Sequence, residues 1–446
     1  MEQILLSLVL ASIISLLVPK WVLLVFCVPT LMILSLMEMI PAIISFGDAD
    51  IEIYDYILFI IGIRIAGPFL IGKQKITLHP ILLPVFIFLS VLLGSTIIAY
   101  YRFGEEIFIS EVIAFLRMVT QIFTFLFFIQ SIRTEKELAL TYKSLEYIGY
   151  IIALTIYINF ILYPLGLNLG EVMSSEGMTR YFGPIGDQVS FILIFFIFKK
   201  LIDRKWIGAA IFAGALLATG TRAAIIPLGI GIGMMAFRMR KEVMLTGKEI
   251  AILLIACTIL SSFIILYDVG GMKTRFSGSQ LELGLKQRVL TAQLALDVFL
   301  DNFLTGVGFT GFRFLSLDYG AWAVFTKNLY FSPNFIATAG NQFLQAATDG
   351  GILGLVSFAW LSIIILKVFK KAIIYSRGDS YNHSLAGYIW FFSLLVGNLT
   401  NAWLLPGSLI SYFMWIILGL AVAKRHLFSE NWVKLRYRNG QFNLAN

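Results

Sequence analysis

Several arginines stand beside or inside apolar segments, where a cation needs a polar partner. Arg117 lies in EVIAFLRMVTQIF, within a span from Val112 to Phe128 that is otherwise uncharged. An arginine at such depth in a membrane helix costs at least about 2.5 to 3.5 kcal/mol. Arg117 therefore faces either a carboxylate, from Glu111 or from another helix, or an anion bound in a cavity.

Two further arginines stand beside turn-forming residues. Arg222 lies in ATGTRAAIIPLG, between two apolar runs, and Arg180 lies in MTRYFGPIGDQVSF, before a helix expected to begin near Asp187. The free backbone N–H groups of a helix start, next to a guanidinium group, can bind an anion. For Arg222 the alternative is a plain arginine that snorkels to the membrane surface.

The segment LKQRVLTAQLALDVFLDNF has the spacing of an amphipathic helix. Its apolar face comprises Leu285, Val289, Ala292, Leu296 and Phe299, and its polar face comprises Lys286, Gln293, Asp297 and Asp301. A helix of this kind lies along a membrane surface. Arg288 falls at the margin of the apolar face, where its planar guanidinium group could bind a lipid phosphate in bidentate fashion.

A second polar stretch, ATAGNQFLQAATDGGILGLV, covers residues 337–356 and leads into an apolar run. Its Asn341, Gln342 and Asp349 could orient or activate a hydroxyl group, as could Asp187 and Glu282 elsewhere. The alternative interpretation is a helix start whose glycines allow close packing.

The elements that carry these residues must be membrane helices. Of the 446 residues, 59% are hydrophobic and 13% are charged, and the mean hydropathy is +0.87. Lipid offers backbone polar groups no partner, so they must be satisfied inside helices. Apolar runs lie near 3–18, 21–37, 54–72, 80–101, 108–131, 140–163, 188–201, 206–219, 222–237, 249–267, 350–368, 385–401 and 403–423. They predict an all-α integral membrane protein, a polytopic bundle of about 12 to 14 transmembrane helices.

Charge sets the expected orientation of this bundle. The net charge is +8, but the lysines and arginines fall in short clusters between apolar runs, as in cytoplasmic loops, so no nucleic-acid partner is expected. All three histidines fall on the cytoplasmic side, so none is a candidate base on the outer face. The chain then divides into N-terminal transmembrane helices (1–163), a periplasmic loop (164–187), central transmembrane helices with the arginine turn (188–267), a large periplasmic loop with the interfacial helix (268–349), and C-terminal helices with a basic cytoplasmic tail (350–446).

These motifs, in this order, resemble those of the O-antigen ligase and O-antigen polymerase family of membrane glycosyltransferases. The resemblance rests on RFSGSQLELGLKQRVLTAQLALDVFLDNFLTGVGFTGF, NQFLQAATDGGILGL, TGTRAA and TRYFGPIGDQVSF. It implies a GT-C-like fold and an enzyme of the bacterial inner membrane, with its active site facing the periplasm. The implied donor and acceptor are glycans linked to undecaprenyl diphosphate, with no metal or cofactor, and a chain-length regulator protein is a further expected partner.

The resemblance also implies roles for the candidate residues. Stabilisation of the leaving diphosphate falls to Arg180, Arg222 and Arg288, and substrate binding falls to Arg117, Arg275, Asp187, Glu282, Asn341, Gln342 and Asp349. The three catalytic arginines are expected to share one outward-facing cavity, which Arg117 reaches from below.

One position separates the two branches of the family. Ligases usually have a histidine before the asparagine that Asn341 matches, and this chain has Gly340 there. A polymerase is therefore favoured. A ligase-type transferase, and a flippase or transporter of lipid-linked oligosaccharides, are the alternatives.

Overall fold

The computed structural model describes residues 44–46, 49–51, 53–71, 79–132, 134–162, 171–175, 178–183, 188–239, 278–309, 311–315, 339–376, 378–397 and 409–438, with a few isolated residues elsewhere. Its helices are α4 (Ile53–Leu70), α5 (Leu82–Phe103), α6 (Glu105–Ser131), α7 (Glu135–Leu162), α8 (Gln188–Ile202), α9 (Trp206–Ala218), the short η3 (Arg222–Ala224), α10 (Ile225–Met239), α13 (Gly278–Asp301), α14 (Phe312–Leu315), α16 (Gln342–Ile374), α17 (Asp379–Gly397) and α18 (Leu409–Arg438). Two antiparallel hairpins accompany them, β1 (Ile44–Phe46) with β2 (Ala49–Ile51), and β3 (Glu171–Ser175) with β4 (Met178–Gly183).

The predicted all-α membrane bundle is confirmed. Among the described residues, four helical segments are long and apolar enough to cross a membrane, namely Leu82–Arg102, Glu111–Gln130, Glu135–Leu162 and Gln342–Ile374. Shorter apolar helices join them at Trp206–Ala218, Ile225–Phe237 and Leu409–Ala423. The runs predicted near 3–18, 21–37 and 249–267 lie almost entirely outside the described residues.

Helix α8 lies inside the bundle, and it is apolar on every side. Nearly all of its residues are buried, as expected for a helix that other helices surround. It contacts α7, α9, α10, α17 and α18. The indole of Trp390 on α17 donates to the carbonyl oxygen of Phe191 on α8 at 2.7 Å, so the one polar group of that buried side chain is satisfied.

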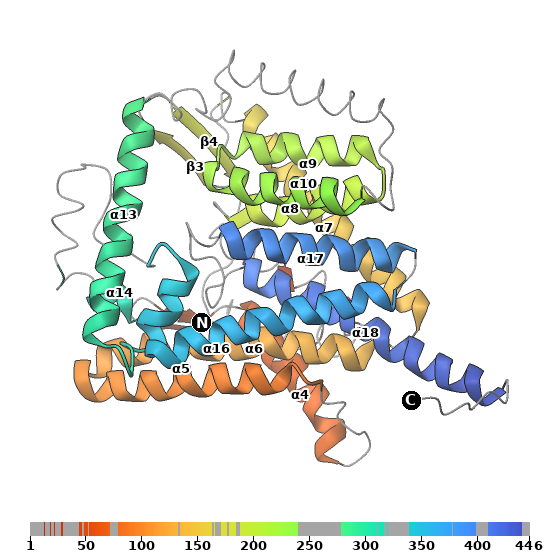
Figure 1. Ribbon diagram of the computed structural model, residues 1–446, viewed down its shortest axis with the longest axis horizontal. Coiled ribbons are helices and arrows are strands. Elements are labelled where there is room, and N and C mark those ends of the chain that lie inside the picture. The colour runs from red at the N-terminus through yellow and green to blue at the C-terminus, as the bar shows by residue number, and fades with distance from the viewer. Residues whose placement is uncertain are drawn as a thin grey trace.

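The short connections fix which helix ends lie together. The end of α8 turns directly into α9, and the end of α16 turns directly into α17, so the cluster Lys199–Lys205 and the start of α17 share one end of the bundle. We call this the lysine end. The starts of α8 and α16 and the end of α9 lie at the opposite end, which we call the arginine end. Helix α13 runs across the arginine end, roughly perpendicular to the spanning helices (Figure 1), as predicted for an interfacial helix.

The structure changes one predicted boundary. Helix α16 begins at Gln342, whereas the apolar run predicted a start at residue 350. The additional first turns are rich in amide and small side chains, and they are buried in the protein instead of facing lipid. The segment 268–349, predicted as a loop with an interfacial helix, therefore also contains α14 and the first turns of α16.

Candidate active site

The arginine turn is held against the start of α8 by a hydroxyl cluster. The Ser190 hydroxyl lies 2.9 Å from the Thr219 hydroxyl and donates to the Thr221 hydroxyl at 2.9 Å. Between the two threonines, Gly220 has a φ of +61°, a left-handed conformation that glycine adopts without strain. These contacts bring the backbone of Arg222, the first residue of η3, to the start of α8.

The hairpin β3–β4 brings a second arginine to the same end. Arg180 on β4 pairs with Met173 on β3, and β4 contacts α7, α8 and α9. The backbones of Arg180 and Arg222 are therefore both at the arginine end. Their side chains lie outside the described part of the chain, so a shared cavity stays a prediction.

Helix α13 has one face against the protein and one open face. Leu294, Ala295 and Val298 are buried in a small apolar core with α14, whereas Val289 and Leu296 are 55% and 44% exposed. These two residues belong to the face predicted to meet the membrane. Arg288 is also exposed, and its place at the margin of that face stays a prediction.

The C-terminal end of α13 is tied to the end of α5. The Arg102 guanidinium group donates to the Asn302 amide oxygen at 2.7 Å, and the Tyr319 hydroxyl donates to the Asp301 carboxylate at 2.8 Å. Burial and the Asp301 carboxylate raise the pKa of Tyr319 above its ordinary value. The phenol therefore stays protonated, and remains a donor, throughout the physiological pH range.

The chain that follows α13, described at residues 302–309 and 311, passes into the bundle between α5, α6 and α16. The N–H groups of Gly308 and Phe309 donate to the hydroxyls of Ser95 and Thr96 on α5, at 3.0 and 3.1 Å. Gly308 N–H also donates to the Asp349 carbonyl oxygen at 3.2 Å, and Ser95 donates to that same oxygen. We call residues 302–309 and 311 the anchor segment, because they fix the end of α13 to three helices.

Two glycines permit this close approach. Gly351 has φ 64° and ψ −157° and kinks α16, and Gly306 has a φ of +68°. A Cβ atom on Gly306 would lie 2.4 Å from the Asp349 carbonyl oxygen, and one on Gly351 would lie 2.5 Å from the Leu304 carbonyl oxygen. Within the 337–356 stretch, the packing interpretation is therefore confirmed for Gly351.

The buried carboxylate of Glu111, predicted only as a possible partner of Arg117, lies against the anchor segment. Glu111 is 0% exposed, and its carboxylate oxygens make no hydrogen bond of normal geometry with the described residues. A Cβ atom on Gly308 or Gly311 would lie 2.4 or 2.7 Å from those oxygens. Glycine at both positions therefore makes room for the carboxylate, and glycines recurring at short spacing after a predicted helix were the sequence signal for this close contact.

The polar start of α16 is built from its own side chains. The Asn341 side-chain oxygen accepts from the N–H groups of Phe343 and Leu344 at 2.8 and 3.2 Å, so Asn341 is the N-cap. The Gln345 amide donates to the Asp349 carboxylate at 2.8 Å and accepts from the Ala339 N–H at 2.7 Å. These bonds account for much of the polarity in the stretch 337–356.

Gln342 and Asp349 face inward. They are 5% and 2% exposed, and with Gln345 they line a cavity of about 30 Å³ whose other walls are mostly apolar. That volume suits a single water molecule. Their predicted role with an acceptor hydroxyl stays a prediction, and it requires the start of α16 to open.

Arg117 forms an ion pair with a carboxylate on another helix. Its guanidinium group contacts the Asp55 carboxylate on α4 at 3.0 Å and lies over the Tyr54 ring at 5.9 Å. The pair supports the structural alternative for Arg117, and its approach to a substrate cavity stays a prediction. Among the other candidates, Arg275 and Asp187 lie outside the described residues, and for Glu282 only the backbone, in α13, is described.

Part of the chain is similar to a known protein family. Residues 207–359 match the O-antigen ligase family, and no curated protein matches the chain. The matched region begins in α9, includes η3, α13 and the anchor segment, and ends in α16. It therefore contains Arg222, Arg288, Asn341 and Asp349, whereas Arg117 and Arg180 precede it. Residues 207–359 are thus similar to the O-antigen ligase family.

Proposed function

We propose that this protein is a polysaccharide polymerase, which joins oligosaccharide repeat units linked to undecaprenyl diphosphate at the periplasmic face of the bacterial inner membrane. The observation that carries the proposal is the match of residues 207–359 to the O-antigen ligase family. Within that region, the arginine turn contacts α8 at the arginine end of the bundle, and α13 crosses the same end. Lysine-rich segments gather at the opposite end, which the positive-inside rule assigns to the cytoplasm. The arginine end then faces the periplasm.

Gly340 supports a polymerase over a ligase. Its φ of +67° is a conformation that residues other than glycine rarely adopt. There is room for a Cβ atom, since the nearest atom, the Thr291 methyl carbon, would lie 3.5 Å from it. The backbone conformation would nevertheless strain a histidine at this position. Gly340, at the position of the ligase histidine, thus forms a backbone turn directly before the N-cap residue Asn341.

The proposed reaction moves a glycan from one lipid diphosphate to another lipid-linked glycan. A hydroxyl oxygen of the acceptor attacks the anomeric carbon of the donor, and the bond from that carbon to the diphosphate oxygen breaks. The hydroxyl proton passes to a base or to water, and the leaving diphosphate keeps the electron pair. Arginines held in place before the reaction can stabilise this developing charge by several kcal/mol.

Arg180, Arg222 and Arg288 are the groups proposed to do this. Like charges held near one another repel in the empty protein and favour a diphosphate ligand. Arg288 is the strongest candidate, because α13 lies across the arginine end and leaves this residue exposed. Arginine also suits the site because its planar fork matches two phosphate oxygens.

Reconstitution with purified substrate distinguishes the three candidate functions. The protein, in vesicles or nanodiscs, is incubated with lipid-linked repeat units alone, and the products are separated by length. A polymerase makes a ladder of longer chains. A ligase makes none until a second acceptor is added, and a flippase changes no covalent bond.

A further inference from the structure

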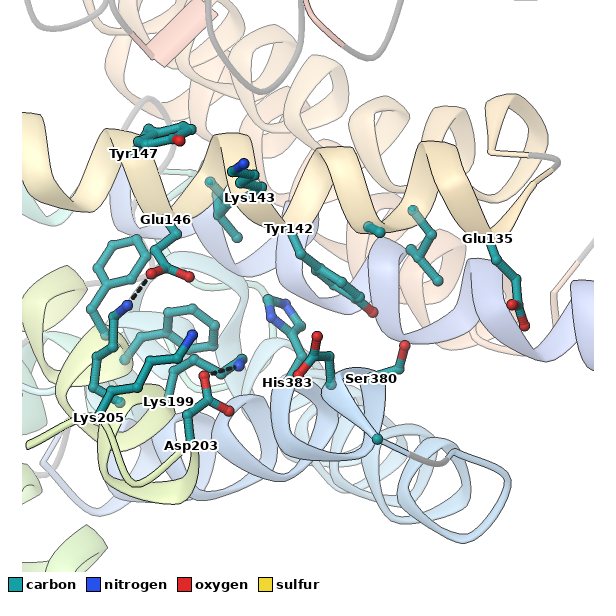
Figure 2. A pocket seen from close by; sticks show the side chains of 18 residues that line it. Glu135, Tyr142, Lys143, Glu146, Tyr147, Lys199, Asp203, Lys205, Ser380 and His383 are labelled. Atoms are coloured by element: carbon teal, nitrogen blue, oxygen red, sulfur yellow. Dashed lines mark hydrogen bonds and ion pairs between the residues drawn. The ribbon is translucent and has the colours of Figure 1, made fainter. Parts of the chain in front are cut away.

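A cavity at the lysine end lies far from the candidate active site. It has a volume of about 770 Å³ and is enclosed by the start of α7, the end of α8 with the following turn, and the start of α17. Figure 2 shows its charged and polar side chains. Nothing in the proposed transfer reaction uses this cavity.

Two of its lysines are already neutralised. Lys200 forms an ion pair with Glu146, and Lys199 forms one with Asp203. The second oxygen of Asp203 accepts from the Asn382 amide at 2.9 Å. Both carboxylates in this part of the cavity are therefore occupied.

The lining balances four lysines with four acidic residues, but two of the lysines have no carboxylate partner among the described residues. Lys143 and Lys205 also line the cavity, and neither forms an ion pair with a described residue. Lys143 lies 5.9 Å from the centre of the Tyr147 ring, which leaves its ammonium group able to bind an anion. The remaining acids, Glu135 and Asp379, are the first residues of α7 and α17, where helix dipoles favour them.

The inner wall offers both a polar group and apolar surface. His383 is 2% exposed, and its Nε2 has no hydrogen-bond partner among the described residues. Its ring packs on Tyr142 at 4.0 Å, and Figure 2 places both between the lysines and Glu135. Phe195 and Phe196 line the same cavity. A ligand that satisfies this lining has an anionic head and an apolar part.

We propose that this cavity binds the headgroup of an anionic phospholipid, with Lys143 and Lys205 on the phosphate and His383 hydrogen-bonded to a headgroup oxygen. Basic pockets between membrane helices on the cytoplasmic side bind phospholipid headgroups in this way. The volume admits a headgroup together with the first part of an acyl chain. The proposal is independent of the transfer reaction.

Native mass spectrometry of the full chain in detergent tests it, with phosphatidylglycerol as the probe and phosphatidylcholine as the neutral comparison. The variant is the double substitution Lys143→Gln and Lys205→Gln. The matched control is Lys136→Gln and Lys370→Gln, two exposed lysines of α7 and α16 that do not line the cavity. At about 1 kcal/mol for each lysine, the double variant should bind phosphatidylglycerol roughly thirtyfold more weakly.

The control should bind like the unmodified protein, and phosphatidylcholine should bind weakly to all three. Equal binding of the two lipids, or unchanged phosphatidylglycerol binding by the double variant, would overturn the proposal. Inorganic phosphate is tested in parallel. If it displaces the lipid in a manner that depends on Lys143 and Lys205, the cavity is a site for free phosphate and the lipid assignment is wrong.

Discussion

Replacing Gly351 with alanine should detach the anchor segment from α16. The backbone of Gly351, at φ 64° and ψ −157°, belongs to a region that is essentially restricted to glycine and costs other residues about 1–3 kcal/mol. The new methyl group would also lie 2.5 Å from the Leu304 carbonyl oxygen, an overlap with backbone that costs a further ~1–3 kcal/mol. The expected loss in free energy of unfolding is therefore about 2–6 kcal/mol.

The neighbouring glycine provides the control. A Cβ atom on Gly350 would lie 3.2 Å from a methyl carbon of Val91, a side chain that can move, and Gly350 has no positive φ. Gly350→Ala should cost about 1 kcal/mol or less. Both variants are compared with the parent by SDS titration in mixed micelles, which reports the apparent free energy of unfolding. Equal losses for the two alanines would refute the proposed contact between α16 and the anchor segment.

Three further predictions concern the arginines and the orientation. Arg288→Ala should abolish chain extension while the amount of protein in the membrane, measured by blot, stays normal. Arg288→Lys should restore extension only partly, because lysine lacks the planar fork, and Lys286→Ala should be tolerated. A normal ladder of polymer lengths from Arg288→Ala would exclude the proposed role. Arg117→Gln and Asp55→Asn should each lower the free energy of unfolding by up to about 3 kcal/mol in the same SDS titration. The double variant should lose less than the sum of the two single losses, and additive losses would contradict the ion pair. A cysteine replacing Gly320 should react with a membrane-impermeant maleimide in intact spheroplasts, and labelling only after the inner membrane is opened would reverse the proposed orientation.

The helices were predictable because apolar runs bounded by charge carry most of the signal in a membrane protein. The runs predicted at 80–101, 188–201 and 206–219 agree closely with α5, α8 and α9. The start of α16 was missed because Gln342 and Gln345 resemble loop residues by composition. They are buried in a helix, and Gln345 satisfies both the Asp349 carboxylate and the Ala339 N–H.

Contacts between distant segments were not predictable from local pattern. Arg117 had two possible types of carboxylate partner by sequence, and only the packing of α4 against α6 selects Asp55. The lysines at 199 and 200 were interpreted only as a signal of orientation. Lys199 pairs with Asp203, four residues away, but Lys200 pairs with Glu146, which is far away in the sequence and lines the same cavity.

Release of undecaprenyl diphosphate by the purified protein tests the central claim most directly. Each new glycosidic bond should free one molecule of this lipid from the donor, and the amount released should rise in proportion to the growth of the chains. The Arg288→Ala protein should release almost none at the same protein concentration. If the unmodified protein carries repeat units across a bilayer but releases no undecaprenyl diphosphate, it is a transporter and the proposed transfer reaction is wrong.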